Sequence, residues 1–138
     1  MAVRIANLGQ FLGGLDRQKR RTDELVGLAT RRISLGVLSR LVLASPVDTG
    51  RFRGNWQVEI GHDPTAALDT VDKSGKGTVA KGSAVIAGAP PFRLVIIANN
   101  LSYGPKLNDG HSKQAPAGFV EAAIDADDAD DAEMSPFL

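Results

Sequence analysis

The residues of this chain that could carry out chemistry are few. Among its 138 residues there is no cysteine, which excludes thiol nucleophiles, disulfides and thiolate metal clusters. His62 and His111 are the only imidazoles, and His111 lies close to Asp109 and Ser112. A nucleophilic Ser needs a His that a carboxylate orients. In this polar segment a hydrogen-bonded loop His is the better interpretation, and a hydrolase around His111 and Asp109 is the weakest hypothesis.

Metal and phosphate sites also lack support in the sequence. The zinc spacings HxxxH and HExxH do not occur. Carboxylates are concentrated in "DADDADDAE" (125–133), where no pocket could raise a pKa for acid catalysis. The stretch "DKSGKGT" (72–78) looks like a phosphate loop but does not have the GxxxxGK[ST] spacing. We therefore expect no catalytic residue, no cofactor and no metal, and we expect that the chain is not an enzyme.

Charge is unevenly distributed along the chain, although the net charge is zero. Residues 1–53 hold 10 Lys or Arg against 4 Asp or Glu (+6), and residues 54–138 hold 6 against 12 (−6). Such asymmetry is typical of a nucleic-acid surface, an acidic tail, or head-to-tail contacts between subunits, and two solvated faces of opposite sign explain it equally well; the sequence does not rank these. Seven aromatic residues in the whole chain are too few for a platform that stacks single-stranded bases.

A long helix is predicted over residues 16–45, because this segment is rich in Leu, Ala and Arg and Pro46 ends it. Its second half has two apolar rows, which predicts cover from two sides, by the chain's own sheet and by either another part of the domain or a neighbouring subunit. No run of about 18 apolar residues suggests a membrane span, and no signal peptide is recognised.

Two strands are predicted. Trp56, Val58 and Ile60 alternate with polar residues, so this strand is half-buried and Trp56 is a core anchor. The strand over 92–100, with an apolar run at 94–98, is expected to be central in the sheet and to place 94–97 in the core. Asn99 and Asn100 then end it, as Asn tolerates the left-handed conformation.

The remaining segments complete a single domain over 1–124. Residues 62–82 are expected to form a mobile loop, and 78–87 fit either a short helix or a strand. A short C-terminal helix is predicted from Pro116, with Val120, Ala123 and Ile124 on one face. Residues 125–138 form an acidic flexible tail whose apolar end, 136–138, could dock on a partner. The predicted fold is therefore α+β: a long N-terminal helix packed on a small, mainly antiparallel sheet, with a short C-terminal helix.

Two stretches carry a resemblance to a known family. "SPVDTGRFRGNWQVEIG" (45–61) and "IIANNLSYGPKLNDGHSKQAPAGFVEAAI" (96–124) resemble the paired motifs of tailed-bacteriophage neck and tail-completion proteins, the head–tail connector components related to minor tail protein Z. The family often has Glu after the Leu at position 107; here Asn108 and Asp109 follow, and Asp109 is expected to supply the carboxylate.

The resemblance implies a structural virion protein that forms a ring, a hexamer, at the head–tail junction and keeps the DNA channel continuous. Its partners would be copies of itself, the phage connector or head-completion protein, and the tail terminator or tail-tube protein, with genomic DNA passing through the lumen and no membrane. Residues expected at subunit or partner interfaces are Asp48, Thr49, Gly50, Arg51, Arg53, Asn99, Asn100, Tyr103, Ser112, Lys113 and Gln114.

Two alternatives stay open. The first is a tail terminator, the ring that caps the finished tail tube. The second belongs to another class, a non-specific DNA-binding accessory protein that uses the basic first half of the chain, including "RQKRR" (17–21). Because turn-rich polar motifs hold loops rigidly without a catalytic purpose, the motif residues favour the structural interpretation.

Overall fold

The computed structural model describes residues 8–126, with side chains from Leu12 onward. It is an α+β fold with a long N-terminal helix, a two-stranded antiparallel sheet and a short C-terminal helix, as the sequence predicts. The elements along the chain are α1 (Leu8–Ala44), α2 (Arg51–Gly54), β1 (Trp56–Ile60), α3 (Lys76–Ala87), β2 (Val95–Asn99), α4 (Gly104–Asn108) and α5 (Phe119–Asp125).

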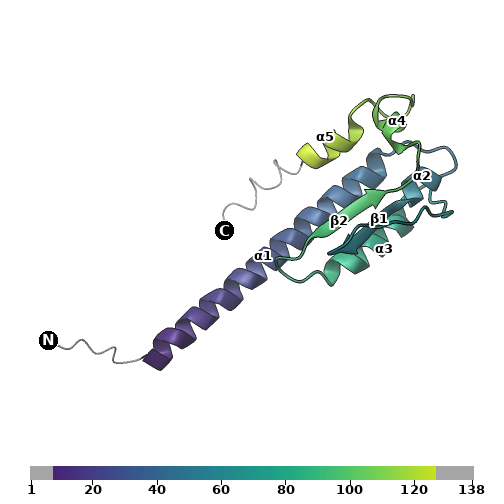
Figure 1. Ribbon diagram of the computed structural model, residues 1–138. Helices are drawn as coiled ribbons and strands as arrows, with labels where there is room; N and C mark the ends of the chain where they lie inside the picture. The colour runs from purple at the N-terminus through teal and green to yellow at the C-terminus, as the bar shows by residue number, and fades with distance from the viewer. Residues whose placement is uncertain (1–7, 127–138) are drawn as a thin grey trace.

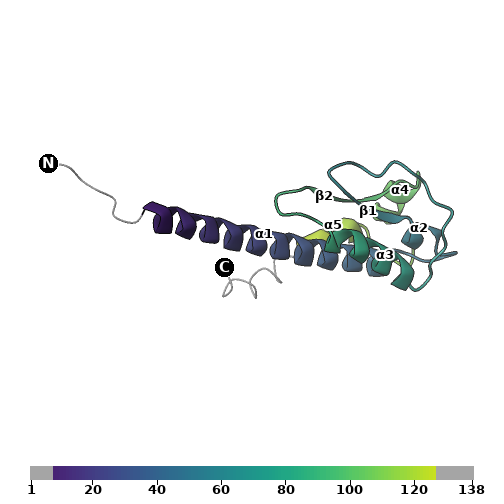
Figure 2. The same cartoon turned by 90° about the horizontal axis from the view of Figure 1, so that it is seen from below.

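Helix α1 is the organising element of the fold. Its second half runs along the body between α3 and α5, while its first half projects away from every other element (Figures 1 and 2). It begins at Leu8 and not at Asp16 as predicted, passing through Gly13 and Gly14. A helix-interior Gly is unfavourable by only about 1 kcal/mol relative to Ala, so two of them weaken the helix without ending it.

The sheet consists of β1 and β2 alone, paired antiparallel with Trp56 opposite Asn99 and Ile60 opposite Val95. The prediction that the second strand is central was wrong, since neither strand of a pair can be central. Leu94 was also wrongly assigned to the core: it precedes the strand and its side chain is 66% exposed. Its apolar neighbours 95–97 are only half-buried, with Val95 and Ile97 packed against the core.

The core lies where α1 meets β1 and α3. Leu38, Leu41 and Val42 of α1 are buried there, and Leu38 packs directly on Gly82 of α3. Phe52 of α2 stands at the centre of an aromatic group, with ring centroids 5.9 Å from Trp56, 6.1 Å from Tyr103 and 6.3 Å from Phe119. Trp56 is buried, which confirms its predicted role as a core anchor.

The segment 62–82 is a loop only as far as Gly75. Helix α3 then begins at Lys76, which settles the helix-or-strand alternative for 78–87 in favour of a helix. Gly75 adopts φ 79°, a conformation that strongly favours glycine, and the Asp72 carboxylate accepts hydrogen bonds from the Gly75 and Thr78 amides at 3.0 and 2.8 Å. A side chain that satisfies the free amides of the first turn fixes where this helix starts.

The C-terminal helix α5 begins at Phe119, three residues later than predicted, because Gly118 turns the chain with φ 77°. Its buried face consists of Phe119 and Ala123; the predicted member Ile124 is exposed. Two short helices, α2 and α4, occupy motif segments for which no helix was predicted. The acidic tail falls outside the described residues from 127 on, as does the apolar end at 136–138.

Candidate functional site

The two motif stretches, far apart in the sequence, meet around one hollow of about 260 Å³. The first stretch supplies 46–52 and the second supplies parts of 103–114. Seven of the eleven predicted interface residues line this hollow: Asp48, Thr49, Gly50, Arg51, Tyr103, Ser112 and Gln114. Of the other four, Arg53, Asn99 and Asn100 lie elsewhere on the body, and Lys113 is exposed beside the hollow.

Side-chain hydrogen bonds to the backbone hold the hollow together. The Gln114 carbonyl oxygen Oε1 accepts from the Val47 amide at 2.7 Å, a contact across 67 positions of the sequence. Within each stretch, the Thr49 hydroxyl accepts from the Arg51 amide at 3.2 Å and the Ser112 hydroxyl accepts from the Gln114 amide at 3.1 Å. The motif residues here set the path of the main chain.

Gly50 shows why the turn in the first motif needs glycine. Its φ is 91°, a conformation that favours glycine, and a Cβ there would lie 2.7 Å from the Lys73 amide nitrogen. The Gly50 carbonyl also accepts from the Asp72 amide at 3.0 Å. The turn and the segment before α3 are therefore packed backbone against backbone.

Arg53 joins three parts of the backbone. Its guanidinium donates to the Lys73 carbonyl at 2.8 Å, the Leu43 carbonyl at 3.0 Å and the Ser45 carbonyl at 2.9 Å, so it connects the end of α1 to the segment before α3. Arg51 donates to the Leu68 carbonyl at 3.2 Å and pairs with Asp69 at 3.4 Å. Both arginines were expected at a subunit or partner interface; here the guanidinium of Arg53 bonds to three carbonyls of its own chain.

Asn99 and Asn100 also act through their side-chain amides. Asn99 donates to the Phe52 carbonyl at 2.8 Å, and Asn100 donates to the Pro64 and Ala66 carbonyls at 2.9 and 3.0 Å. The left-handed conformation predicted for this strand exit is absent: over residues 8–126 the only residue other than glycine with positive φ is Phe92. The backbone leaves the strand without it, and the Asn99 side-chain oxygen accepts from the Leu101 amide at 3.2 Å.

Asn55, which the sequence analysis did not single out, is fully buried. Its amide donates to the Arg51 and Leu68 carbonyls at 2.6 and 2.9 Å, and its Oδ1 accepts from the Leu68 amide at 2.7 Å. These bonds hold the 62–75 loop to the body. The one signal in the sequence is an Asn placed between the motif residues Arg53 and Trp56.

Asn108 fills the position where the family often has Glu. It donates to the Glu121 carboxylate at 2.9 Å and accepts from the Val120 amide at 3.0 Å, joining α4 to the first turn of α5. This hydrogen bond from Asn108 holds the pKa of the Glu121 carboxyl below its ordinary value. Asp109, expected to take the role of the family's Glu, is exposed.

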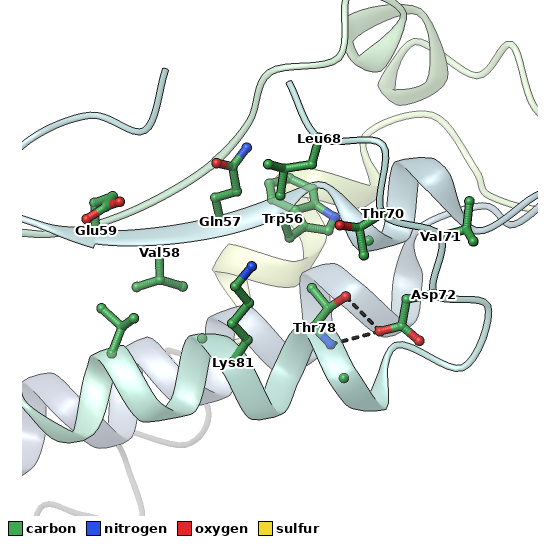
Figure 3. Close-up of a pocket in the computed structure, with 14 residues that line it drawn as sticks. Trp56, Gln57, Val58, Glu59, Leu68, Thr70, Val71, Asp72, Thr78 and Lys81 are labelled. Atoms are coloured by element: carbon green, nitrogen blue, oxygen red, sulfur yellow. Dashed lines mark hydrogen bonds between the residues drawn. The ribbon is translucent and has the colours of Figure 1, made fainter. Parts of the chain in front are cut away.

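A second and larger hollow, of about 530 Å³, lies between β1, α3 and the 68–72 segment (Figure 3). Its apolar lining comes from Trp56, Val58, Leu68, Val71 and Val85. Glu59 lines it as well, and the Lys81 side chain extends from α3 toward β1 (Figure 3). Beside it the Asp72 carboxylate accepts from the Thr78 hydroxyl at 2.7 Å (Figure 3). That bond, with those from the Thr78 and Gly75 amides, outweighs desolvation and lowers the pKa of Asp72.

The described part of the chain holds no cluster of three or more His, Asp or Glu residues placed to bind a metal ion. His111 is exposed in the loop between α4 and α5. Among the helices of residues 8–126, none has the length and apolar character needed to cross a membrane. At both hollows, side-chain hydrogen bonds fix the path of the backbone, and the lining residues form surfaces that another molecule could contact.

Comparisons of the chain with protein-family models, with curated proteins and with solved structures found no match.

Proposed function

We propose that this chain is a structural virion protein of a tailed phage, a subunit of a closed ring at the head–tail junction. The observation that carries the proposal is the use of the motif side chains. Gln114, Asn99 and Asn100 bond to backbone groups between 36 and 67 positions away, and Arg53 bonds to the Lys73 carbonyl 20 positions away. The motifs that resemble the neck family therefore hold a surface in a defined shape.

The surface of α1 supports assembly with other chains. Five of its leucines are exposed although they lie on a helix that packs against the body: Leu12, Leu15, Leu28, Leu35 and Leu43. Scattered apolar side chains are common on protein surfaces, but Leu12 and Leu15 lie on the projecting first half of α1, as is typical of an element that a partner covers. A subunit of a ring uses one surface against a different surface of its neighbour. The projecting first half of α1 and the body formed by the other elements are two such different surfaces.

The resemblance implies the partners and the location. The ring, a hexamer in this proposal, would join the portal-side connector to the tail and leave a lumen for the genomic DNA. Asp48, Thr49, Tyr103 and Lys113 are exposed on or beside the smaller hollow, so they are the motif residues available to a neighbouring subunit or partner.

A deletion in the phage that encodes the chain tests the proposal. We expect filled heads and separate tails in lysates, with joining restored by the wild-type chain supplied in trans. Normal joined particles would overturn it. Tails of abnormal length that still attach would identify the tail-terminator alternative, since a ring that caps the tube controls where growth stops.

A further inference from the structure

The first part of α1, residues 8–24, forms an arm that leaves the body (Figures 1 and 2). The side-chain hydrogen bonds from α1 to α5 and to the segment after α3 come from later positions: Arg31 donates to the Ala89 carbonyl at 3.1 Å and Arg40 to the Ala123 carbonyl at 2.8 Å. Every side chain from 15 to 22 is exposed. A free helix of this length is marginally stable in water, so the arm gains stability if something covers it.

The arm has the residue spacing of a helix that docks in a groove. Leu8, Phe11, Leu12 and Leu15 follow each other at i, i+3, i+4 and i+7, the spacing of the apolar anchors of such helices. The side chains of Leu12 and Leu15 are 50% and 47% exposed. The basic run 17–21 follows directly after these anchors.

A groove suited to such anchors lies on the body. It is the 530 Å³ hollow between β1 and α3, in which five apolar side chains lie among six polar or charged ones (Figure 3). Val71 stands at this groove with 62% of its surface exposed. Burying a fully exposed Leu side chain stabilises a contact by about 1.5–3 kcal/mol, and Leu12 and Leu15 are half exposed. Two such anchors offset only part of the cost of bringing two molecules together, so the rest of the arm has to contribute to the contact.

The arm cannot reach the groove of its own chain. Leu38 of α1 packs on Gly82, which lines the groove, and Leu15 lies 23 positions earlier on the same unbroken helix. At 1.5 Å per residue this places Leu15 about 35 Å away along the helix axis. Only a second molecule can therefore bring these leucines to the groove.

Charge complementarity favours a second copy as that molecule. The segment 59–72, which forms one wall of the groove and the loop leading to it, contains four acidic residues, of which Asp69 is paired with Arg51, and no Lys or Arg: Glu59, Asp63, Asp69 and Asp72. One basic side chain, Lys81, lines the opposite wall. The run 17–21 of the arm, between Asp16 and Asp23, contains four basic residues and no acidic one. Opposite charges beside an apolar contact fix its orientation and speed its formation.

We propose that the arm of one copy docks in the β1–α3 groove of the next copy, with Leu12 and Leu15 in the groove and the 17–21 run beside the acidic segment 59–72. The contact joins two different surfaces, so it propagates from copy to copy and closes a ring where the rotation allows. The inference deepens the proposed function and rests on it.

Single cysteines test the contact directly, because the chain has none of its own. Full-length Leu15→Cys and Val71→Cys chains are mixed in equal amounts and treated with a short bismaleimide, both as purified protein up to its solubility limit and in phage particles. We expect a 15–71 cross-link between copies. The matched control replaces Val71→Cys with Ala117→Cys, an exposed position that does not line the groove, and should give no such product.

A second variant separates docking from folding. In the double variant Leu12→Asp, Leu15→Asp the arm cysteine is placed at Gly14→Cys, and its cross-link to Val71→Cys reports the docking. This cross-link should fall by at least about tenfold, since two anchors are lost. Because both leucines are already half exposed, the melting temperature should hardly change. Leu28→Asp is the control: this side chain is 55% exposed on the same helix and lies about 160° around the axis from Leu12, so the cross-link should persist.

The possible outcomes divide cleanly. Cross-links only between two arms, or none in either preparation, would overturn the docking while leaving the neck function untouched. A 15–71 cross-link in a phage whose heads and tails join without the chain would support the docking and defeat the proposed function. Loss of the cross-link as salt rises to about 1 M would show that the charged segments contribute, because screening at that concentration acts within about 3 Å.

Discussion

The indole nitrogen of Trp56 lies 2.7 Å from the hydroxyl oxygen of Ser45, to which it donates, and that hydroxyl donates in turn to the Leu41 carbonyl at 2.6 Å. All three residues are buried. Two hydrogen bonds in series thus connect β1 to the last turn of α1, at the point where the first motif begins. The N–H of a buried Trp usually has a hydrogen-bond partner of this kind.

Replacing Ser45→Ala should lower the free energy of unfolding by about 1–3 kcal/mol, because the indole N–H would remain buried without an acceptor. Urea unfolding followed by Trp fluorescence measures the change, since Trp56 is the only Trp. Ser102→Ala is the matched control on the surface and should change stability by less than about 0.5 kcal/mol. Equal effects of the two substitutions would show that the Ser45 bond contributes nothing.

Removing the Asn55 side chain should detach the 62–75 loop. Asn55→Ala loses three hydrogen bonds, two of them to the Leu68 backbone, and should reduce the free energy of unfolding by about 2–3 kcal/mol. Hydrogen exchange at the Leu68 amide measures the local effect, which should be a large loss of protection. Gln57→Ala, which removes an exposed bond to the Ala66 carbonyl, is the control and should cost less than about 1 kcal/mol. An Asn55→Ala chain whose Leu68 amide stays protected would contradict this account.

The order and type of the main elements could be predicted because they follow from local patterns. The long helix has a helix-forming composition that ends at Pro46, and the first strand alternates from Trp56 to Ile60. The start of α3 could not be predicted in this way. It depends on Asp72, a residue outside the helix whose carboxylate bonds to amides inside it, and on the positive φ of Gly75.

In the candidate site, too, some features could be predicted from the sequence and others could not. The turn at Gly50 and the core position of Trp56 follow from residue type. The internal roles of Arg53 and Asn100 do not, because their acceptors are carbonyls that only the folded chain brings near. From the sequence, a charged side chain in a motif such as that of Arg53 would be assigned to an interface, and only the structure shows that it bonds to its own backbone.

Gly82→Ala should destabilise the fold although alanine is the better helix former. A Cβ at this position would collide with Leu38 and lie 3.0 Å from Val58, so α1, α3 and β1 would have to move apart. We expect a loss of about 1–3 kcal/mol in thermal or urea unfolding, the usual range for overpacking a core. Gly13→Ala has the nearest atom at 3.7 Å, on the Arg17 side chain, and should instead stabilise α1 slightly. A stabilising Gly82→Ala would disprove the tight packing described for this point.

Stability should fall in acid partly through Asp72. Its pKa is lowered in the folded chain, chiefly by the Thr78 hydroxyl, so the carboxylate stabilises the fold above the unfolded-state pKa near 3.8 and this contribution is lost as pH falls through the lower folded-state value. Asp72→Asn should therefore unfold with a weaker dependence on pH below about pH 4 than the wild type. Thr78→Val tests the cause, as it keeps the shape and removes the hydroxyl. Parallel pH profiles for all three chains would exclude Asp72 as a source of the acid sensitivity.

Phe92→Asn should make the isolated chain more stable. Phe92 has φ 62° and a side chain that is 70% exposed, so its ring adds little packing to offset a backbone conformation that bulky residues avoid. Asn tolerates this conformation, and we expect a gain of about 0.5–1 kcal/mol in urea unfolding. Leu94→Asn makes a similar change at an exposed position without positive φ and should leave stability unchanged. A gain in stability for Phe92→Asn alone would mean that the phenyl side chain lowers the stability of the free chain, as expected of a side chain that contacts a partner. No gain would mean that the loop relieves the strain by itself.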